Sequence, residues 1–138
     1  MPGGEFELIE RHLSALGVNR ADVKLGVGDD AALVDPQPAA QLRCASAHLV
    51  LSNRTTQQIN AAIQATFQNL AMDLRKVGNT PAWATLALTL PQADSTLVAM
   101  LASTVHSACL AQNIAVIGGD TTSGEASLTI FLTGLAQP

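Results

Sequence analysis

Residues 55–90, TTQQINAAIQATFQNLAMDLRKVGNTPAWATLALTL, combine a long helical pattern with a strand pattern and thereby decide the fold class. In the first part, apolar residues recur at steps of three and four, which predicts an amphipathic helix over Thr55–Val77. Gly78 ends this helix, and residues 79–81 turn the chain. In the second part, Trp83–Leu90 places alternate leucines on one face, which is typical of a half-buried strand.

The same two patterns recur along the rest of the chain. Helical spacing predicts further helices over Glu5–Leu16 and Ser95–Gln112. Alternating or β-branched runs predict short strands at residues 23–27, 31–34, 42–47, 115–117 and 128–132. We therefore expect a single α+β domain over residues 1–138, built as a mixed sheet with two long helices on one face.

Composition limits the classes of partner and compartment. Hydrophobic residues make up 48% of the 138 residues, enough to bury a core. Aromatic residues make up 3% and the net charge is −4 without a basic cluster, which argues against nucleic acid and anionic membranes as partners. Glu5, Glu7 and Glu10 stand where a signal peptide would be basic and then apolar, so we expect a cytoplasmic protein. Cys44 and Cys109 lack paired spacing and are expected to be reduced, mostly buried thiols.

Two acidic segments bracketed by glycines are candidates for a functional site. Gly26–Asp30 and Ile117–Gly124 each follow a β-branched run, and both are predicted to be loops. Glycine allows the backbone to approach a ligand closely, and carboxylates suit Mg²⁺ that is bound together with phosphate oxygens. Aspartates also favour plain turns, but the adjacent Asp29 and Asp30 repel one another when both are ionised. A metal–phosphate site is therefore the favoured interpretation.

These segments occur in the order found in a known family. The chain resembles the N-terminal domain of thiamine-monophosphate kinase, which shares a superfamily with aminoimidazole ribonucleotide synthetase. The residues that carry the resemblance are Gly4–Ile9, Gly26–Leu33, Pro81-Ala82-Trp83, Leu86–Pro91 and Ile117–Gly124. The resemblance implies ATP-dependent phosphorylation of thiamine monophosphate in thiamine diphosphate biosynthesis, with Mg²⁺ as cofactor. It also implies a homodimer whose N-terminal sheets join as a barrel.

Family roles can be carried over to individual residues of this chain. The metal ligands implied by the resemblance are Asp29, Asp30, Asp73 and Asp120. The implied contacts to nucleotide or phosphate are Gly28, Gly118, Gly119, Thr121 and Thr122. For Asp73, a solvated position on the helix surface is an equally good interpretation. The family's C-terminal domain supplies further contacts, which we expect a separate partner chain to provide.

One continuous region departs from the family pattern. Ser46-Ala47-His48 stands where the family has Ser-Thr-Asp, so an imidazole replaces a metal-binding carboxylate. Leu70-Ala71-Met72 stands where the family has Asn, Leu and Ser. An imidazole could bind a softer metal such as Zn²⁺, but His12 and His106 have no spacing that would complete such a site. An ordinary histidine is therefore favoured at position 48.

Three functions remain open at this point. In the first, the domain binds Mg²⁺-ATP or a related phosphate ligand but does not complete phosphoryl transfer alone. In the second, it is a non-catalytic dimerisation or regulatory module descended from the kinase. In the third, which the altered region disfavours, it is a stand-alone kinase. The retained glycine–aspartate segments favour the first.

Overall fold

The computed structural model describes residues 16–25, 32–37, 40–92 and 94–136. Along this part of the chain the elements are β1 (Val23–Leu25), β2 (Leu33–Val34), β3 (Gln41–Val50), α2 (Thr56–Lys76), β4 (Thr80–Leu90), α3 (Ser95–Gln112), β5 (Ala115–Ser123) and β6 (Ser127–Ala136). The helix predicted over Glu5–Leu16 lies outside the described residues except for its last position.

The long helix α2 confirms the pattern that decided the fold class. It begins with a capping box: the Thr55 hydroxyl accepts from the backbone N–H of Gln58 at 3.1 Å, and the Gln58 side chain accepts from the backbone N–H of Thr55 at 2.9 Å. Arg75 and Lys76 occupy the last turn, where cations stabilise the helix dipole. The buried face carries Ile59, Ile63, Phe67, Leu70, Ala71 and Leu74.

The second helix, α3, spans the predicted residues. The Asp94 carboxylate caps its start by accepting from the backbone N–H of Leu97 at 3.1 Å. Asn113 ends the helix in the left-handed conformation with φ of 59°, which asparagine tolerates better than most residues. The predicted bounds hold because capping and periodicity are local properties of the sequence.

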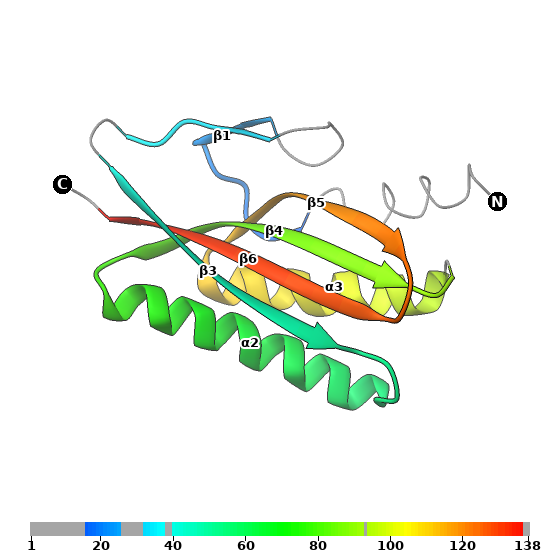
Figure 1. The fold of residues 1–138 in the computed structure, drawn as a ribbon. Helices are drawn as coiled ribbons and strands as arrows, with labels where there is room; N and C mark the ends of the chain where they lie inside the picture. The colour runs from blue at the N-terminus through cyan, green and yellow to red at the C-terminus, as the bar shows by residue number, and fades with distance from the viewer. Residues whose placement is uncertain (1–15, 26–31, 38–39, 93, 137–138) are drawn as a thin grey trace.

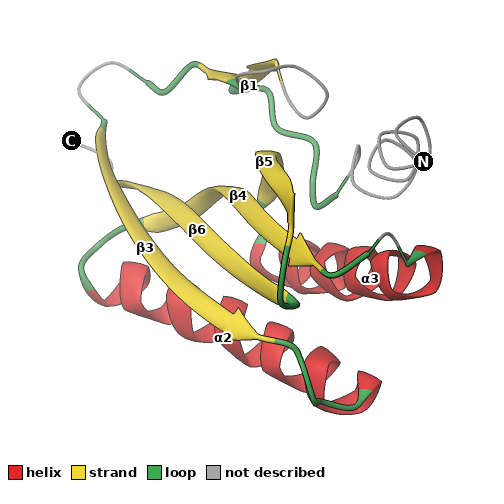
Figure 2. Ribbon diagram, turned by 45° about the vertical axis from the view of Figure 1, so that its right-hand side comes forward, coloured by secondary structure: helices red, strands yellow, loops and turns green. Residues whose placement is uncertain are grey.

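The main sheet has strand order β3-β6-β4-β5. Strands β4 and β5 are parallel, whereas β6 is antiparallel to both of its neighbours, so the sheet is mixed as predicted. The β3-α2-β4 and β4-α3-β5 connections place both helices on the same face (Figures 1 and 2). Strands β1 and β2 form a separate antiparallel pair on the other side of the sheet.

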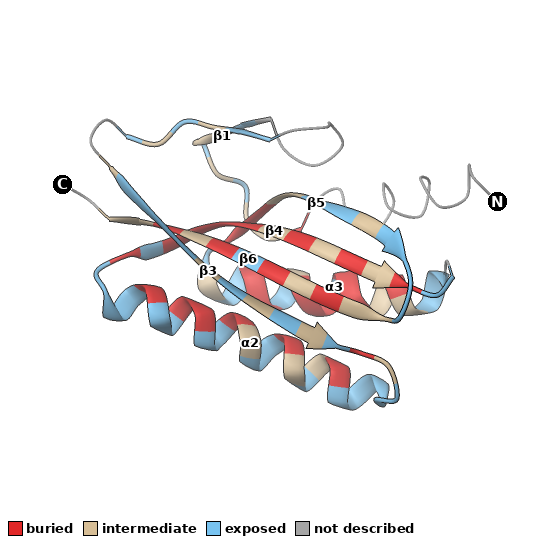
Figure 3. Cartoon of the chain, viewed as in Figure 1, coloured by how far each residue is buried: buried red, intermediate tan, exposed pale blue. Residues whose placement is uncertain are grey.

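The main core lies between the helices and the sheet. Alternate residues of β4 and β6, such as Leu86, Leu88, Ile130 and Leu132, belong to it together with the apolar faces of α2 and α3. This alternation is visible as buried bands along the central strands (Figure 3). A small second cluster on the opposite face centres on Trp83 and is covered by residues from β1 and β2.

Two predictions about the strands and cysteines were wrong. Residues 118–123 form the second half of β5 rather than a loop, because they continue the parallel pairing with β4 from Thr85↔Gly118 to Leu90↔Ser123. That pairing involves a strand more than 20 residues earlier, which local sequence patterns do not reveal. Cys44 is exposed on β3, although Cys109 is buried as expected. In the described part of the chain, neither helix combines the length and apolarity needed to cross a bilayer.

Candidate functional site

The sheet surface opposite α2 and α3, here called the helix-free face, carries polar residues in register. Side chains alternate between faces along a strand, and the core residues on each strand fix which positions point away from the helices. Its central part consists of Ser46, His48, Val50, Thr85, Ala87, Thr89, Gly118, Asp120, Thr122, Ser127, Thr129 and Phe131. Of the residues predicted to contact metal or phosphate on β5, Gly118, Asp120 and Thr122 therefore belong to this face, and Gly119 and Thr121 to the opposite one.

One cross-strand row of this face contains both His48 and Asp120. His48 pairs with Thr129 of β6, Thr129 pairs with Ala87 of β4, and Ala87 pairs with Asp120 of β5. The His48 Nδ1 lies 2.7 Å from the Thr129 hydroxyl oxygen. The His48 imidazole therefore lies in the same cross-strand row as Asp120 but on β3, at the opposite edge of the sheet from β5.

The adjacent row supplies a pair of hydroxyl groups. Thr89 of β4 pairs with Thr122 of β5, and their hydroxyl oxygens lie 2.9 Å apart. This contact fixes the side on which the Thr122 side chain points, and Asp120 lies two residues earlier on the same side. A carboxylate and two hydroxyl groups can thus present oxygen atoms to one ligand.

The Asp120 carboxylate is exposed, and among the described residues its hydrogen-bond partner is its own neighbour in sequence. Its Oδ1 accepts from the backbone N–H of Thr121 at 2.9 Å. The two preceding glycines lie in extended strand, and a Cβ at Gly119 would collide with the Leu86 carbonyl group. A Cβ at Gly118 would meet only the Thr85 methyl at 3.9 Å. Close strand packing therefore requires glycine at position 119, and the strand also holds Asp120 at the sheet surface.

The structure does not gather all the predicted metal ligands. Asp73 is exposed on α2 in the helical layer, whereas Asp120 belongs to the helix-free face. Gly28, Asp29 and Asp30 lie outside the described residues. Within residues 16–25, 32–37, 40–92 and 94–136, no group of three or more His, Cys, Asp or Glu side chains is arranged to hold a metal ion. Asp120 fits a hard cation by its oxygen chemistry, but further ligands must come from elsewhere.

Sequence reasoning missed a polar network that fastens the segment before β1. Arg20 Nε donates to Asp22 Oδ1 at 3.0 Å, and its Nη2 donates to Asp22 Oδ2 at 2.9 Å. The Trp83 indole N–H donates to the same Asp22 Oδ1 at 3.0 Å. The pairing with Arg20, opposed by partial burial, lowers the pKa of the Asp22 carboxyl from its ordinary value. Arg20 and Asp22 lie in a turn in which the Val23 N–H donates to the Arg20 carbonyl at 3.2 Å, and the opposite charges two residues apart were the available signal.

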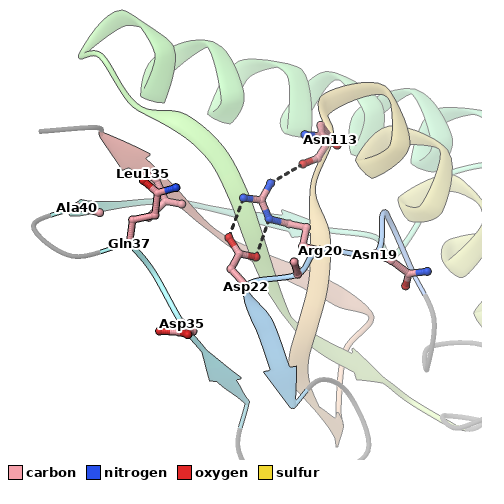
Figure 4. Close-up of a pocket in the computed structure, with 9 residues that line it drawn as sticks. Asn19, Arg20, Asp22, Asp35, Gln37, Ala40, Asn113 and Leu135 are labelled. Atoms are coloured by element: carbon pink, nitrogen blue, oxygen red, sulfur yellow. Dashed lines mark hydrogen bonds and ion pairs between the residues drawn. The ribbon is translucent and has the colours of Figure 1, made fainter.

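A cavity of about 370 Å³ lies beside this network (Figure 4). Its lining includes Arg20, Asp22, Asp35 and the C-cap residue Asn113, whose carbonyl accepts from Arg20 Nη1 at 3.4 Å. Leu135, near the end of β6, also lines it, which places the cavity away from the Thr129 row. Arg20 is paired with Asp22, so the second carboxylate of the lining, that of Asp35, has no ion pair among the described residues.

Comparison with known proteins identifies the family. The family described as "AIR synthase related protein, N-terminal domain" matches residues 28–137. The chain belongs to this family. The match contains the whole four-stranded sheet, both helices and the Gly118–Thr122 strand.

Two thiamine-monophosphate kinases confirm the predicted resemblance. The thiamine-monophosphate kinase of Escherichia coli K12 is 36% identical over 137 residues, covering 97% of this chain and 42% of that protein. The crystal structure of thiamine-monophosphate kinase from Stenotrophomonas maltophilia K279a superposes with a TM-score of 0.67 at 32% identity, covering 95% of this chain and 40% of that one. This chain thus spans about two fifths of the length of these kinases.

A more distant neighbour shows the same fold. The hydrogenase maturation protein HypE, solved in complex with ATP, has a TM-score of 0.61 at 15% identity and is matched over 97% of this chain and 40% of that one. At this identity the likeness concerns the fold alone. The α+β architecture predicted from the sequence is therefore confirmed both by the structure and by its relatives.

Proposed function

We propose that this chain is a divergent thiamine-monophosphate-kinase-like domain that binds Mg²⁺-ATP or a related phosphate ligand and does not complete phosphoryl transfer on its own. The observation that carries the proposal is the placement of Asp120 and Thr122 side by side on the helix-free face, next to the Thr89 hydroxyl. Two glycines precede them on the same strand, and the family membership supports a nucleotide ligand.

The residues on β5 suit a phosphate–metal complex. Thr122 would donate a hydroxyl hydrogen bond to a phosphate oxygen, and the backbone at Gly118 and Gly119 would allow close approach. Thr121 pairs with the core residue Leu88, so its side chain points to the helix side and only its backbone is available to the ligand on this face. Asp120, together with Asp29 and Asp30, would hold Mg²⁺, which neutralises phosphate charge when bound. Asp73 belongs to this proposal only as a ligand to a separate ion, because it lies in the helical layer.

We propose that the chain does not complete phosphoryl transfer alone because it has too few groups to neutralise the phosphate charge. Phosphoryl transfer depends on nearly complete neutralisation of phosphate charge, and loss of one element of that clamp slows catalysis by orders of magnitude. In the row containing Asp120, position 48 supplies an imidazole bonded to Thr129 instead of a carboxylate. We also propose that full activity needs contacts of the kind made by the remaining three fifths of the relatives.

A thermal-unfolding experiment tests the ligand claim. Millimolar Mg²⁺ with a non-hydrolysable ATP analogue should raise the Tm of the wild-type chain, because ligands that bind only the folded state stabilise it. The paired substitution Asp29→Asn with Asp30→Asn should abolish this shift. A Tm that is indifferent to Mg²⁺ and analogue in both proteins would contradict the proposal.

A transfer assay tests the claim of incomplete activity. The chain alone, supplied with Mg²⁺-ATP and thiamine monophosphate, should form no thiamine diphosphate above background. Adding the separately expressed C-terminal part of the Escherichia coli kinase should raise product formation if the missing contacts act in trans. Turnover by the isolated chain would establish the stand-alone kinase instead.

The exposed apolar residues of the sheet favour a second function, a dimerisation module. Leu42, Val50 and Phe131 are 54%, 45% and 41% exposed, and all three point away from the helices. Apolar patches on a sheet surface often mark interfaces, and we propose a homodimer formed through this surface. A stable dimer that does not bind the ATP analogue would favour the module over the nucleotide-binding domain.

A further inference from the structure

The short segment before β1 extends the sheet at the outer edge of β5. Gly17 forms an antiparallel bridge with Ala115, the first residue of β5. The backbone N–H of Val116 donates to the Leu16 carbonyl at 3.1 Å, and the N–H of Val18 donates to the Ile114 carbonyl at 2.9 Å. Residues 16–18 therefore hold the beginning of the strand that later carries Gly118–Thr122.

The third hydrogen bond of this segment goes to a histidine side chain. The backbone N–H of Gly17 donates to Nδ1 of His106 on α3 at 3.0 Å, across 89 residues of sequence. Because a backbone N–H can only donate, Nδ1 must carry the lone pair and the ring must be the neutral tautomer with its proton on Nε2. His106 thus ties α3 to the segment that borders β5.

Packing at Gly17 leaves no room for the Cβ atom of any other residue type. Its φ is +78°, a left-handed conformation that favours glycine, and a Cβ there would collide with the Ile114 carbonyl. The same Cβ would lie 3.1 Å from Cβ of Cys109 on α3. Residues 16–18 therefore pack closely between α3 and the start of β5. This packing holds the Gly17 N–H against Nδ1 of His106.

We propose that His106 is a positioning residue for the phosphate-binding strand β5, acting through the Gly17 segment. This inference rests on the proposed function, since it concerns the same strand. The His106 ring belongs to the helical layer rather than to the helix-free face, so we propose no direct contact between His106 and the ligand. Cys109, which lies close to Gly17, has a pKa that burial raises to about 12, so its thiol stays neutral.

Three variants separate positioning from general stability. His106→Asn keeps a carbonyl oxygen close to the position of Nδ1, whereas His106→Phe keeps a planar ring without an acceptor. Gly17→Ala dislodges the same segment without altering α3. Each variant is compared with the wild-type chain by circular dichroism, by amide hydrogen exchange at residues 17, 18 and 116, and by calorimetric titration with Mg²⁺ and a non-hydrolysable ATP analogue.

We expect His106→Phe and Gly17→Ala to accelerate exchange at these amides by about fivefold or more, the effect of losing one hydrogen bond. The same variants should weaken analogue binding by about two- to tenfold. His106→Asn should restore both properties.

The outcomes distinguish this inference from the proposed function. If His106→Phe and Gly17→Ala exchange faster but bind the analogue as tightly as the wild-type chain does, His106 has no positioning role. The proposed function would stand in that case. If His106→Phe leaves amide exchange unchanged, His106 does not hold the Gly17 segment in place. Failure of the wild-type chain to bind the analogue would overturn the proposed function, while the exchange data would still decide whether His106 holds the segment.

Discussion

His48 and Asp120 share one cross-strand row on the helix-free face, at opposite edges of the four-stranded sheet. Three strand spacings separate them, which corresponds to roughly 14 Å. The two residues therefore cannot bind the same ion within one chain. His48 stands where the family resemblance implies an aspartate, so this edge of the row carries an imidazole while the opposite edge carries the Asp120 carboxylate.

Restoring that carboxylate should strengthen the response to metal. We predict that His48→Asp increases the Mg²⁺-dependent rise in Tm, because a carboxylate is a better ligand for a hard cation than an imidazole. Cys44→Asp is the matched control, since residue 44 points to the same side of β3 but lies outside the row. Equal responses in the two variants would show that position 48 has no special relation to the metal site.

Asp22 should make stability depend on pH. Because pairing lowers its pKa in the folded state, the charged carboxylate stabilises the fold above the unfolded value near 3.8, and this contribution is lost as pH falls. At pH 7, Asp22→Asn should reduce the free energy of unfolding by about 1–3 kcal/mol. The difference from the wild-type chain should shrink in urea titrations below pH 4, near the unfolded value.

Asp35→Asn provides the control for this prediction. Asp35 is an exposed carboxylate that lines the same cavity. Its substitution should change the free energy of unfolding by less than about 0.5 kcal/mol. A pH-independent loss in Asp22→Asn would show that packing around Trp83, rather than the charge, is what Asp22 contributes.

The two glycines on β5 should differ sharply in their tolerance of alanine. Gly119→Ala should destabilise the fold by about 1–3 kcal/mol, because the new Cβ meets the Leu86 carbonyl group and forces β4 and β5 apart. Gly118→Ala should have a much smaller effect, since its Cβ makes an ordinary contact with Thr85. Equilibrium unfolding in urea measures both, and equal losses would contradict the observed packing of β5.

A charge on the exposed sheet surface should prevent the proposed dimer. Phe131→Asp places a carboxylate at the centre of the helix-free face, where association would bury it. Sedimentation velocity should then show a monomer, whereas Met72→Asp, on the exposed side of α2, should leave the dimer intact. A dimer that survives Phe131→Asp but not Met72→Asp would place the interface on the helices.

The helices could be predicted from the sequence because their signals are local. The apolar stripe of α2 and the caps at Thr55 and Asp94 lie within a few residues of the structure they specify. The extended form of Gly118–Thr122 could not be predicted in this way, because it depends on pairing with β4. Likewise, the contact between Asp22 and Trp83 joins positions 61 residues apart.

The candidate site was predicted unevenly for the same reason. Composition and glycine spacing indicated residues 118–122, and the structure places Asp120 and Thr122 on the helix-free face but Thr121 on the opposite side of the strand. Helical spacing alone could not decide where Asp73 points, and the structure puts it in the other layer. Nothing in the sequence indicated the role proposed for His106. Its hydrogen-bond partner is the backbone N–H of Gly17, and a backbone group leaves no pattern in the sequence.

Calorimetric titration of the wild-type chain with a non-hydrolysable ATP analogue, with and without millimolar Mg²⁺, tests the central claim most directly. We predict saturable binding that requires Mg²⁺ and is lost in Asp120→Ala. Glu125→Ala, which removes an equal charge just beyond β5, should bind as the wild-type chain does. Absence of binding under both conditions, or equal binding by Asp120→Ala, would contradict a nucleotide site on β5.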